Sequence, residues 1–375
     1  MLPQGNPVKV LHLTAGNMYG GVETLLTTLA RLRHLTPEIE PEFGLCFHGR
    51  QWDDLTAAGV RVHDLGPVRV SRPWTVLRAR RRLRQVLAAQ RPELVVSHGG
   101  WPHALFAPVA RRAGTRVVFA AHGFLAGRHW IEWWAARTPP DVVIFNSHAT
   151  AATVSTVFPG VKAEVVYYPV APTTVGDPAA VRAEVRADFG TAADAVVVLQ
   201  ASRLERWKGQ SVLLDALARL RDVPGWECWL AGGPQRPDEE AFLSELRTAA
   251  DRAGITGRVR FLGQRSDVAR LMAAADVFCQ PNAGPEPFGI VFVEALYAGL
   301  PVVSSDFGGA AEIVKEGCGV LTPPGDAAAV ADALAALIRD LDQRQTLGSR
   351  GPARAAALCD PAQQLRRLAE CVRGG

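Results

Sequence analysis

Two glutamates, Glu286 and Glu294, stand eight positions apart in an otherwise apolar part of the sequence. A carboxylate in apolar surroundings needs polar partners, so we expect both to bind a ligand. Phe288, Gly289 and Ile290 are expected to form the first turn of a helix that contains Glu294. The backbone N–H groups of such a turn can receive an anion such as a diphosphate. Glu286 is then placed to bind sugar hydroxyls, and Glu294 to bind ribose hydroxyls.

An alternative interpretation of the two glutamates needs no ligand. Glu286 would be an acid that favours the helix dipole, and Glu294 would be an unrelated surface residue. The apolar neighbours of Glu294 disfavour this alternative, because glutamate is rarely buried without a partner.

A group of basic residues lies between a predicted strand and the helix that follows it. Arg203 can place its planar guanidinium on two diphosphate oxygens, while Lys208 supplies a compact charge. Arg206 is a third candidate. Any one basic residue in such a loop is explained by solvation alone, but the group together with the two glutamates indicates a site for a nucleoside diphosphate.

Short apolar runs alternate with amphipathic helical stretches along the whole chain, a pattern typical of β-α-β units around parallel sheets. Their high content of Val, Ile and Leu indicates strands that are buried on both faces. The predicted strands cover residues 8–15, 43–47, 60–65, 94–97, 116–121, 141–146 and 164–168 in the first half, and 195–199, 227–231, 258–262, 276–280 and 301–304 in the second.

A proline-rich segment, residues 168–178, separates the two halves and is interpreted as a linker. We therefore predict two facing doubly wound, Rossmann-like α/β domains with parallel sheets, over residues 1–172 and 173–375. An alternative for the last helix is that it packs back on the N-terminal domain. Ligands of such sheets bind beyond the carboxyl ends of the strands, so the two domains are expected to share a cleft.

Length and composition limit the classes of protein. The 375 residues fit two domains, since one domain usually takes about 100–200 residues. Forty-one basic and 37 acidic residues give a net charge of only +4, which does not indicate a nucleic-acid partner. Six widely spaced cysteines are typical of a reducing compartment. With no basic leader and no apolar run of about 20 residues, we expect the chain to remain in the cytoplasm.

Patterns typical of several other chemistries are missing from the sequence. It has no Gly-x-Gly-x-x-Gly or Gly-x4-Gly-Lys-Ser/Thr motif, which disfavours dinucleotide dehydrogenases and P-loop enzymes. Asp340 and Asp342 imitate a metal-binding Asp-x-Asp, but residues two apart on a helix point to different faces. We therefore expect neither a metal nor a bound cofactor, and the nucleotide sugar enters as a substrate.

Taken together, these segments resemble the signature of the retaining family-4 glycosyltransferases of the GT-B fold. The hallmark of that family is a glutamate, seven residues and a second glutamate, which Glu286 and Glu294 match. Arg203 and Lys208 match the family's diphosphate clamp. The resemblance covers nearly the whole chain.

Segments outside the glutamate pair add to this resemblance. Gly20 and Gly21 resemble the family's N-terminal glycine loop, which would face the diphosphate and the acceptor. His122 matches its cleft histidine, so the resemblance implies that His122 lies against the transferred sugar. Gly308 and Gly309 echo a glycine pair that follows the second glutamate in the family.

The resemblance implies transfer of a hexose from a UDP- or GDP-linked donor to a glycan, lipid-linked or small-molecule acceptor, with retention of the anomeric configuration. The C-terminal domain would hold the donor and the N-terminal domain the acceptor. Arg203, Lys208 and the helix N-terminus would stabilise the charge that builds on the leaving diphosphate. Three alternatives stay open: a nucleotide-sugar epimerase, a glycan phosphorylase, and a non-catalytic sugar-nucleotide-binding protein.

An arginine-rich segment, residues 72–91, contains no acidic residue and is interleaved with leucine and tryptophan. A basic amphipathic helix of this kind can lie on an anionic membrane, which would place the enzyme peripherally on the inner face. An ordinary solvated helix fits the pattern equally well. Both interpretations stay open.

Aromatic and histidine side chains near His122 are interpreted as structural. Trp130, Trp133 and Trp134 recur at helical spacing, which favours packing in the core over stacking on an acceptor ring. His98 and His103 follow a predicted strand and are interpreted as hydrogen-bonded residues without a role in the site.

Overall fold

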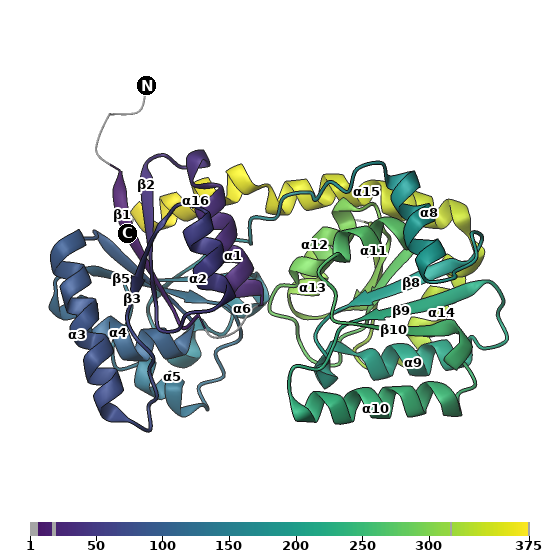
Figure 1. Cartoon of the computed structure of the whole chain (residues 1–375), viewed down its shortest axis with the longest axis horizontal. Helices are drawn as coiled ribbons and strands as arrows, with labels where there is room; N and C mark the ends of the chain where they lie inside the picture. The colour runs from purple at the N-terminus through teal and green to yellow at the C-terminus, as the bar shows by residue number, and fades with distance from the viewer. Residues whose placement is uncertain (1–6, 17–19, 316, 374–375) are drawn as a thin grey trace. The chain divides into compact units, whose positions relative to one another are not determined.

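The computed structural model describes residues 7–16, 20–315 and 317–373, and the chain divides into two compact units. The first unit comprises Met1–Val170 together with Cys359–Gly375, and the second comprises Ala171–Leu358. Figure 1 shows the first unit in purple and blue with the yellow helix α16, and the second in teal, green and, for its last helices, yellow. Each is a parallel sheet with helices on both faces, which confirms the predicted α/β class.

The first unit is built on a seven-stranded parallel sheet of order β3-β2-β1-β4-β5-β6-β7. The order reverses at β1, which pairs with both β2 and β4, as in doubly wound folds. The strands are β1 (Val8–Thr14), β2 (Ile39–Leu45), β3 (Arg61–Asp64), β4 (Leu94–His98), β5 (Arg116–Ala121), β6 (Val142–Phe145) and β7 (Lys162–Val165). The helices are α1 (Gly21–Arg31), α2 (Arg50–Ala57), α3 (Pro73–Gln90), α4 (Gly100–Arg112), α5 (Trp130–Ala135), α6 (His148–Ala151), α7 (Val154–Val157) and α16 (Pro361–Arg373).

Alternate residues of each strand serve opposite faces of this sheet. Leu11 and Leu13 of β1 pack in a core with α3 and α4. Val10, which precedes Leu11 and faces the other side of the sheet, belongs to a second core that includes Val372 of α16. The side of the sheet that Val10 faces is therefore covered by the last helix of the chain.

The C-terminal helix α16 belongs to the first unit through specific contacts. The Val170 N–H donates to the Cys359 carbonyl at 2.9 Å, just where the chain leaves and re-enters this unit. Arg116 Nη1 donates to the Val372 carbonyl at 3.2 Å. Leu365 and Val372 are buried. These hydrogen bonds and buried side chains hold α16 against the sheet of the first unit.

The second unit has a six-stranded parallel sheet of order β10-β9-β8-β11-β12-β13. Its strands are β8 (Val196–Ala201), β9 (Trp226–Ala231), β10 (Val259–Gly263), β11 (Val277–Gln280), β12 (Val302–Ser305) and β13 (Gly319–Thr322). Its helices are α8 (Pro178–Asp188), α9 (Gln210–Arg219), α10 (Pro237–Arg252), α11 (Val268–Ala274), α12 (Ile290–Tyr297), α13 (Gly308–Ile313), α14 (Ala327–Arg339) and α15 (Leu341–Cys359), which reaches the first residue of the re-entrant segment. The edge strand β13 was not predicted, because its four residues are short and mostly half-buried.

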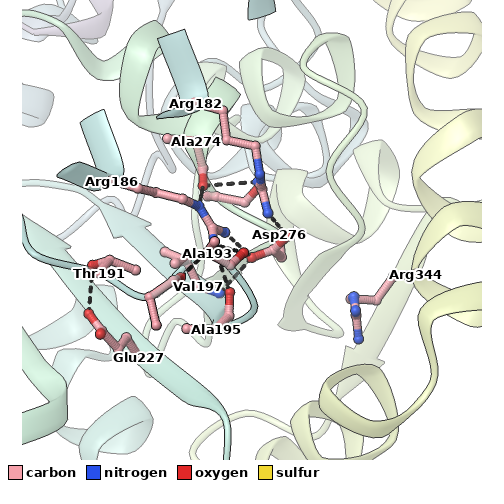
Figure 2. Close-up of polar contacts among 12 residues, drawn as sticks. Arg182, Arg186, Thr191, Ala193, Ala195, Val197, Glu227, Ala274, Asp276 and Arg344 are labelled. Atoms are coloured by element: carbon pink, nitrogen blue, oxygen red, sulfur yellow. Dashed lines mark hydrogen bonds and ion pairs between the residues drawn. The ribbon is translucent and has the colours of Figure 1, made fainter. Parts of the chain in front are cut away.

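A buried ion-pair cluster ties α8 to the amino ends of β8 and β11, as Figure 2 shows. Asp276 accepts from Arg182 at 2.7 Å and from Arg186 at 2.6 Å. Its Oδ2 also accepts from the Val197 N–H at 2.7 Å. Arg186 further donates to the Ala274 carbonyl at 3.0 Å. The Asp276 carboxylate is thus satisfied by three donors, and the cluster lies at the amino edge of the sheet, opposite its carboxyl edge.

Candidate functional site

The residues of the predicted donor site follow the carboxyl ends of β8 and β11, which are neighbours in the second sheet. Lys208, beyond β8, and Glu286, beyond β11, form an ion pair with 2.5 Å between Nζ and Oε2. Their side chains are only 12% and 9% exposed. Two residues 78 positions apart in the sequence thus form one site.

Glu286 is the centre of a buried polar cluster. Its Oε2 also accepts hydrogen bonds from Asn282 Nδ2 at 3.3 Å and Gln280 Nε2 at 3.4 Å. Lys208 Nζ lies 4.0 Å from the centre of the Trp207 ring, a cation–π contact. The carboxylate is therefore satisfied by donors on one oxygen, while the ammonium has a carboxylate and an aromatic face as neighbours.

A glycine brings the two loops together. Gly209 follows Lys208 and is the N-cap of α9, with φ of +77°. A Cβ at this position would lie 1.9 Å from the Pro281 carbonyl oxygen, which no side chain allows. The Trp207 carbonyl accepts from the Ala283 N–H at 2.8 Å in the same place. Glycine at position 209 is therefore a steric requirement for the contact between the loops that follow β8 and β11.

Helix α12 begins two residues later than expected, at Ile290 rather than at Phe288. Phe288 and Gly289 precede it, and Ile290 is its first residue. Gly289 is the N-cap with φ of +94°, a left-handed conformation that cannot continue a helix. The prediction that residues 288–290 form the first turn is wrong for Phe288 and Gly289, and Phe288 is instead buried.

The glycine pair Gly308 and Gly309 lets α13 approach the same loop. The Gly309 N–H donates to the Glu286 carbonyl at 2.7 Å. A Cβ on Gly309 would lie 2.6 Å from the Phe288 Cα, and one on Gly308 would lie 2.5 Å from the Glu286 carbonyl oxygen. These glycines fix the backbone on which the Glu286 side chain is mounted.

Glu294 and Arg203 lie apart from the central pair. Glu294 is on α12, partly buried, and burial raises the pKa of its carboxyl. Within the described ranges this carboxylate has no hydrogen-bond or ion-pair partner. Arg203 is 42% exposed and pairs with Glu205 at 3.0 Å. Among the described residues, no polar contact joins Arg203 or Glu294 to Lys208 or Glu286.

The glycine loop of the first unit is described only in part. Gly20 is the N-cap of α1 and Gly21 is its first residue, while residues 17–19 lie outside the described ranges. The Gly20 carbonyl accepts from the Thr24 N–H at 3.0 Å. The loop thus enters α1 beyond the carboxyl end of β1, at the point where the strand order reverses.

His122 directly follows β5, and both of its ring nitrogens are engaged. Nε2 lies 2.9 Å from His98 Nδ1, and Nδ1 lies 2.6 Å from the Tyr168 hydroxyl. Burial lowers the pKa of His122 to about 4, so the ring is neutral near pH 7. In this arrangement a ring nitrogen contacts a further ligand only if one of these two bonds breaks.

Sequence reasoning treated His98 as a bystander and did not consider Tyr168, yet both contact His122. The available signal was positional, because His98 ends β4 and His122 follows β5, and these strands are neighbours. His103 differs: it bonds Ser97 Oγ at 2.7 Å and the Thr138 carbonyl at 2.8 Å.

The tryptophans of α5 divide between core and surface. Trp134 packs against the core of the first unit and lies under Arg80, 5.9 Å from ring centre to Cζ. Trp130 and Trp133 are 49% and 62% exposed. The expectation of core packing is therefore wrong for two of the three, because a helix of six residues turns only one face to its neighbour α4.

The described part of the chain contains no cluster of three or more His, Cys, Asp or Glu side chains arranged to hold a metal ion. Likewise, none of the helices in this part is both long enough and apolar enough to cross a bilayer.

Two family descriptions match the chain in consecutive segments. "Glycosyltransferase Family 4" matches residues 19–173, and "Glycosyl transferases group 1" matches residues 181–354. These matches fall on the first and second units in turn.

Curated relatives and solved structures agree with these families. The chain is 34% identical over 324 residues, 80% of each chain, to a GDP-mannose-dependent alpha-(1-6)-phosphatidylinositol monomannoside mannosyltransferase of Mycobacterium tuberculosis. It is 47% identical to a phosphatidyl-myo-inositol mannosyltransferase of Mycobacterium leprae over 136 residues, 36% of this chain and about a third (34%) of that protein. The structure of Anabaena HepE with UDP and glucose superposes with a TM-score of 0.83 at 27% identity, covering 97% of this chain and 99% of that one.

Proposed function

Because this chain belongs to glycosyltransferase family 4, with the GT-B architecture, we propose that it moves a hexose from a nucleoside diphosphate to a hydroxyl acceptor. The observation that supports this best is the pairing of Lys208 with Glu286 beside α12, on the edge of the sheet where doubly wound folds bind nucleotides. An epimerase, a phosphorylase or a non-catalytic binding protein is not favoured, since the relatives are sugar transferases.

The donor that we favour is GDP-mannose. The M. tuberculosis relative, which matches 80% of the chain, is named for GDP-mannose, whereas HepE was solved with UDP and glucose. UDP-glucose is therefore the second candidate. For the acceptor we favour a lipid-linked polyol or glycan, because both mycobacterial relatives are named for phosphatidylinositol acceptors.

The proposed chemistry uses the charge exchange that the site offers. A diphosphate that binds Lys208 draws the lysine ammonium away from Glu286. The Glu286 carboxylate can then accept hydrogen bonds from sugar hydroxyls. Arg203 is exposed enough to turn from Glu205 onto the diphosphate. As the bond from the anomeric carbon to the diphosphate breaks, negative charge grows on the leaving group and these cations stabilise it. The acceptor oxygen bonds to the anomeric carbon, and its proton passes to the leaving diphosphate. Glu294 would bind the ribose, and retention of configuration is part of the proposal.

In the first unit we place the acceptor site. Gly20 and Gly21 begin α1 beyond β1, and His122 lies beyond β5, so both stand at the carboxyl edge of that sheet. Backbone N–H groups at the start of α1 suit an anionic part of an acceptor, such as a phosphate.

Transfer with radiolabelled donors tests the proposal. We expect label from GDP-mannose to reach a polar-lipid extract or an inositol acceptor, with Lys208→Ala reducing turnover about a hundredfold and Lys162→Ala, an exposed lysine of the first unit, leaving it unchanged. Donor consumption without acceptor would indicate an epimerase or phosphorylase. Donor binding without any turnover would indicate a non-catalytic protein.

A lipid acceptor requires the enzyme to reach a membrane, and α3 provides a suitable face. Trp74 and Leu77 on α3 are 65% and 64% exposed. Arg78, Arg81 and Arg84 follow on the same side of the helix at spacings of three and four residues, and all are exposed. The opposite side, with Val76 and Leu83 among its residues, is buried in the core.

This combination of apolar and basic side chains supports docking of α3 on an anionic bilayer, with Trp74 at the interface. Arg80 does not contribute, because it donates to the Leu105 carbonyl at 2.8 Å. Peripheral binding on the cytoplasmic face of the membrane is thus the finer form of the proposal.

Vesicle sedimentation tests this docking. The wild type should sediment with vesicles of phosphatidylcholine and phosphatidylglycerol at low salt, and replacement of Arg78, Arg81 and Arg84 by glutamine should reduce the bound fraction, because each arginine contributes about 1 kcal/mol. Arg221→Gln, an exposed arginine of the second unit, is the matched control. A wild type that ignores anionic vesicles would make a soluble acceptor the better hypothesis.

A further inference from the structure

Three histidines and a tyrosine form an unbroken chain of hydrogen bonds in the first unit. His12 Nδ1 lies 2.9 Å from His98 Nε2, and His98 Nδ1 lies 2.9 Å from His122 Nε2. His122 Nδ1 lies 2.6 Å from the Tyr168 hydroxyl, which also accepts from Asn146 Nδ2 at 3.3 Å. Only the His122 end of this chain belongs to the candidate site.

The strand register explains the regular spacing of the rings. His12 is paired with Val96, two residues before His98, and His98 is paired with Ala120, two residues before His122. Each step therefore moves one strand across the sheet and two residues toward its carboxyl edge. The ring centres of both histidine pairs are 5.2 Å apart. All three side chains share the face that carries Val10, because strand residues two apart point the same way.

The surroundings keep these rings neutral. A cavity of about 40 Å³ adjoins them, lined by leucines of α1 and α16, and none of its described lining residues is a carboxylate, lysine or arginine. Burial lowers the pKa of His12 and of His122 to about 4. It lowers the pKa of His98 further, with additional repulsion from the two neighbouring rings.

Neutral rings in such a chain cannot choose their tautomers independently. A neutral imidazole carries one N–H, and each contact between two ring nitrogens needs one donor and one acceptor. Either every Nδ1 carries the proton and His122 donates to Tyr168, or every Nε2 carries it and Tyr168 donates to His122. The state of the Tyr168 hydroxyl is therefore linked to the tautomer of His12, three bonds away.

We propose that Tyr168, His98 and His12 are positioning residues that fix the tautomer and the ring orientation of His122. The role of His122 toward the sugar rests on the proposed function, whereas the coupling of tautomers along the histidine chain does not. A single tautomer fixes which nitrogen of His122 donates and which accepts, and the flanking bonds hold the ring in place. His122 would then present its ring to a bound ligand with a preset geometry.

Deletion of the Tyr168 hydroxyl tests the coupling without disturbing packing. In two-bond proton–nitrogen spectra of the labelled full-length protein, we expect each of His12, His98 and His122 to show one tautomer, the same in all three. Tyr168→Phe should shift the nitrogen signals of all three rings, including His12, which Tyr168 does not touch. Ser97→Ala is the control, because Ser97 Oγ bonds His103 and not the chain, so only His103 signals should move.

Kinetics separate positioning from mere structure. We expect Tyr168→Phe to lower kcat about tenfold while the donor KM stays within about twofold, and Ser97→Ala to leave both near wild type. His98→Phe, which interrupts the chain at its centre, should leave His12 unaffected by a further Tyr168→Phe change. If Tyr168→Phe moves only the His122 signals, or if the three wild-type tautomers differ, the proposal is wrong. A kcat of Tyr168→Phe equal to that of the wild type would overturn the positioning role. Absence of transfer by the wild type would count against the proposed function alone.

Discussion

At the scale of single residues, the central feature is that Lys208 and Glu286 neutralise each other at 2.5 Å. A diphosphate must compete with this carboxylate for the ammonium, so the pair makes donor binding weaker than an unpaired lysine would. In the proposed chemistry, the same exchange would release Glu286 for the sugar. One ion pair would then link binding of the diphosphate to binding of the hexose.

Glu286→Gln separates these two roles. Removing the charge frees Lys208 and lessens repulsion of the diphosphate, so we expect GDP to bind about tenfold more tightly while transfer falls about a hundredfold. Titration calorimetry and the transfer assay measure the two effects. Asp222→Asn, at an exposed aspartate paired with Arg221 at 3.4 Å, is the control and should change neither. Weaker GDP binding in Glu286→Gln would contradict the proposed exchange.

Buried histidines predict a dependence of stability on pH. Burial lowers the pKa of His103 to about 4, against 6.5 in the unfolded chain. As pH falls from 6.5 toward 4, the unfolded state takes up a proton that the folded state refuses, so stability present above pH 6.5 is lost. His103 alone accounts for about 2 kcal/mol at pH 5.

Urea unfolding at pH 7 and pH 5 measures this effect. His103→Phe should lower stability at pH 7, through the lost bonds to Ser97 and Thr138, but should reduce the difference between the two pH values by about 2 kcal/mol. An unchanged difference would mean that His103 is charged in the folded protein.

What the sequence reveals at this scale depends on whether the partners are encoded nearby. Spacing alone predicts that Glu286 and Glu294 act as a pair, since one precedes and the other lies within the same helix. It does not reveal that Lys208 meets Glu286, or that His12 and His98 meet His122, because these contacts depend on strand order and register. The hydrogen-bonded chain of His12, His98 and His122 could therefore not be predicted from the sequence.

At the scale of elements, glycines and capping clusters decide where helices begin. Gly209 and Gly289 adopt left-handed conformations at the starts of α9 and α12, the two helices that follow the site loops. The Asp276 cluster fixes α8 at the opposite end of the sheet. Strand positions could be predicted from apolar runs, except for β13. The start of α12 was predicted too early, because Gly289 caps the helix and is not part of it.

Among substitutions outside the candidate site, Asp276→Ala should lower the stability of the second unit most. It leaves the buried Arg186 guanidinium without its carboxylate and removes the acceptor of the Val197 N–H, so we expect a loss of about 3–5 kcal/mol. Urea unfolding measures this. Asp222→Ala, where the aspartate is exposed and pairs with Arg221 at 3.4 Å, should cost less than about 1 kcal/mol. Equal effects of the two changes would contradict the role of the cluster.

At the scale of the whole molecule, the chain forms two units, each built on a parallel sheet. Their alternating strands and helices could be predicted from the sequence, because parallel sheets buried on both faces give continuous apolar runs. The return of α16 to the first unit stood only as an alternative, since no short-range pattern says on which sheet a final amphipathic helix packs. The similarity to HepE over 97% of the chain and to the M. tuberculosis enzyme over 80% of it agrees with this architecture.

The central claim is that the second unit binds a nucleoside diphosphate sugar through Lys208 and the residues around it. Titration calorimetry with GDP-mannose and UDP-glucose in the presence of EDTA tests it most directly. We predict that one donor binds the wild type without added metal, and that Lys208→Ala weakens this binding about tenfold or more while Arg221→Ala does not. Binding that disappears in EDTA, or that is equal in wild type and Lys208→Ala, would contradict the account.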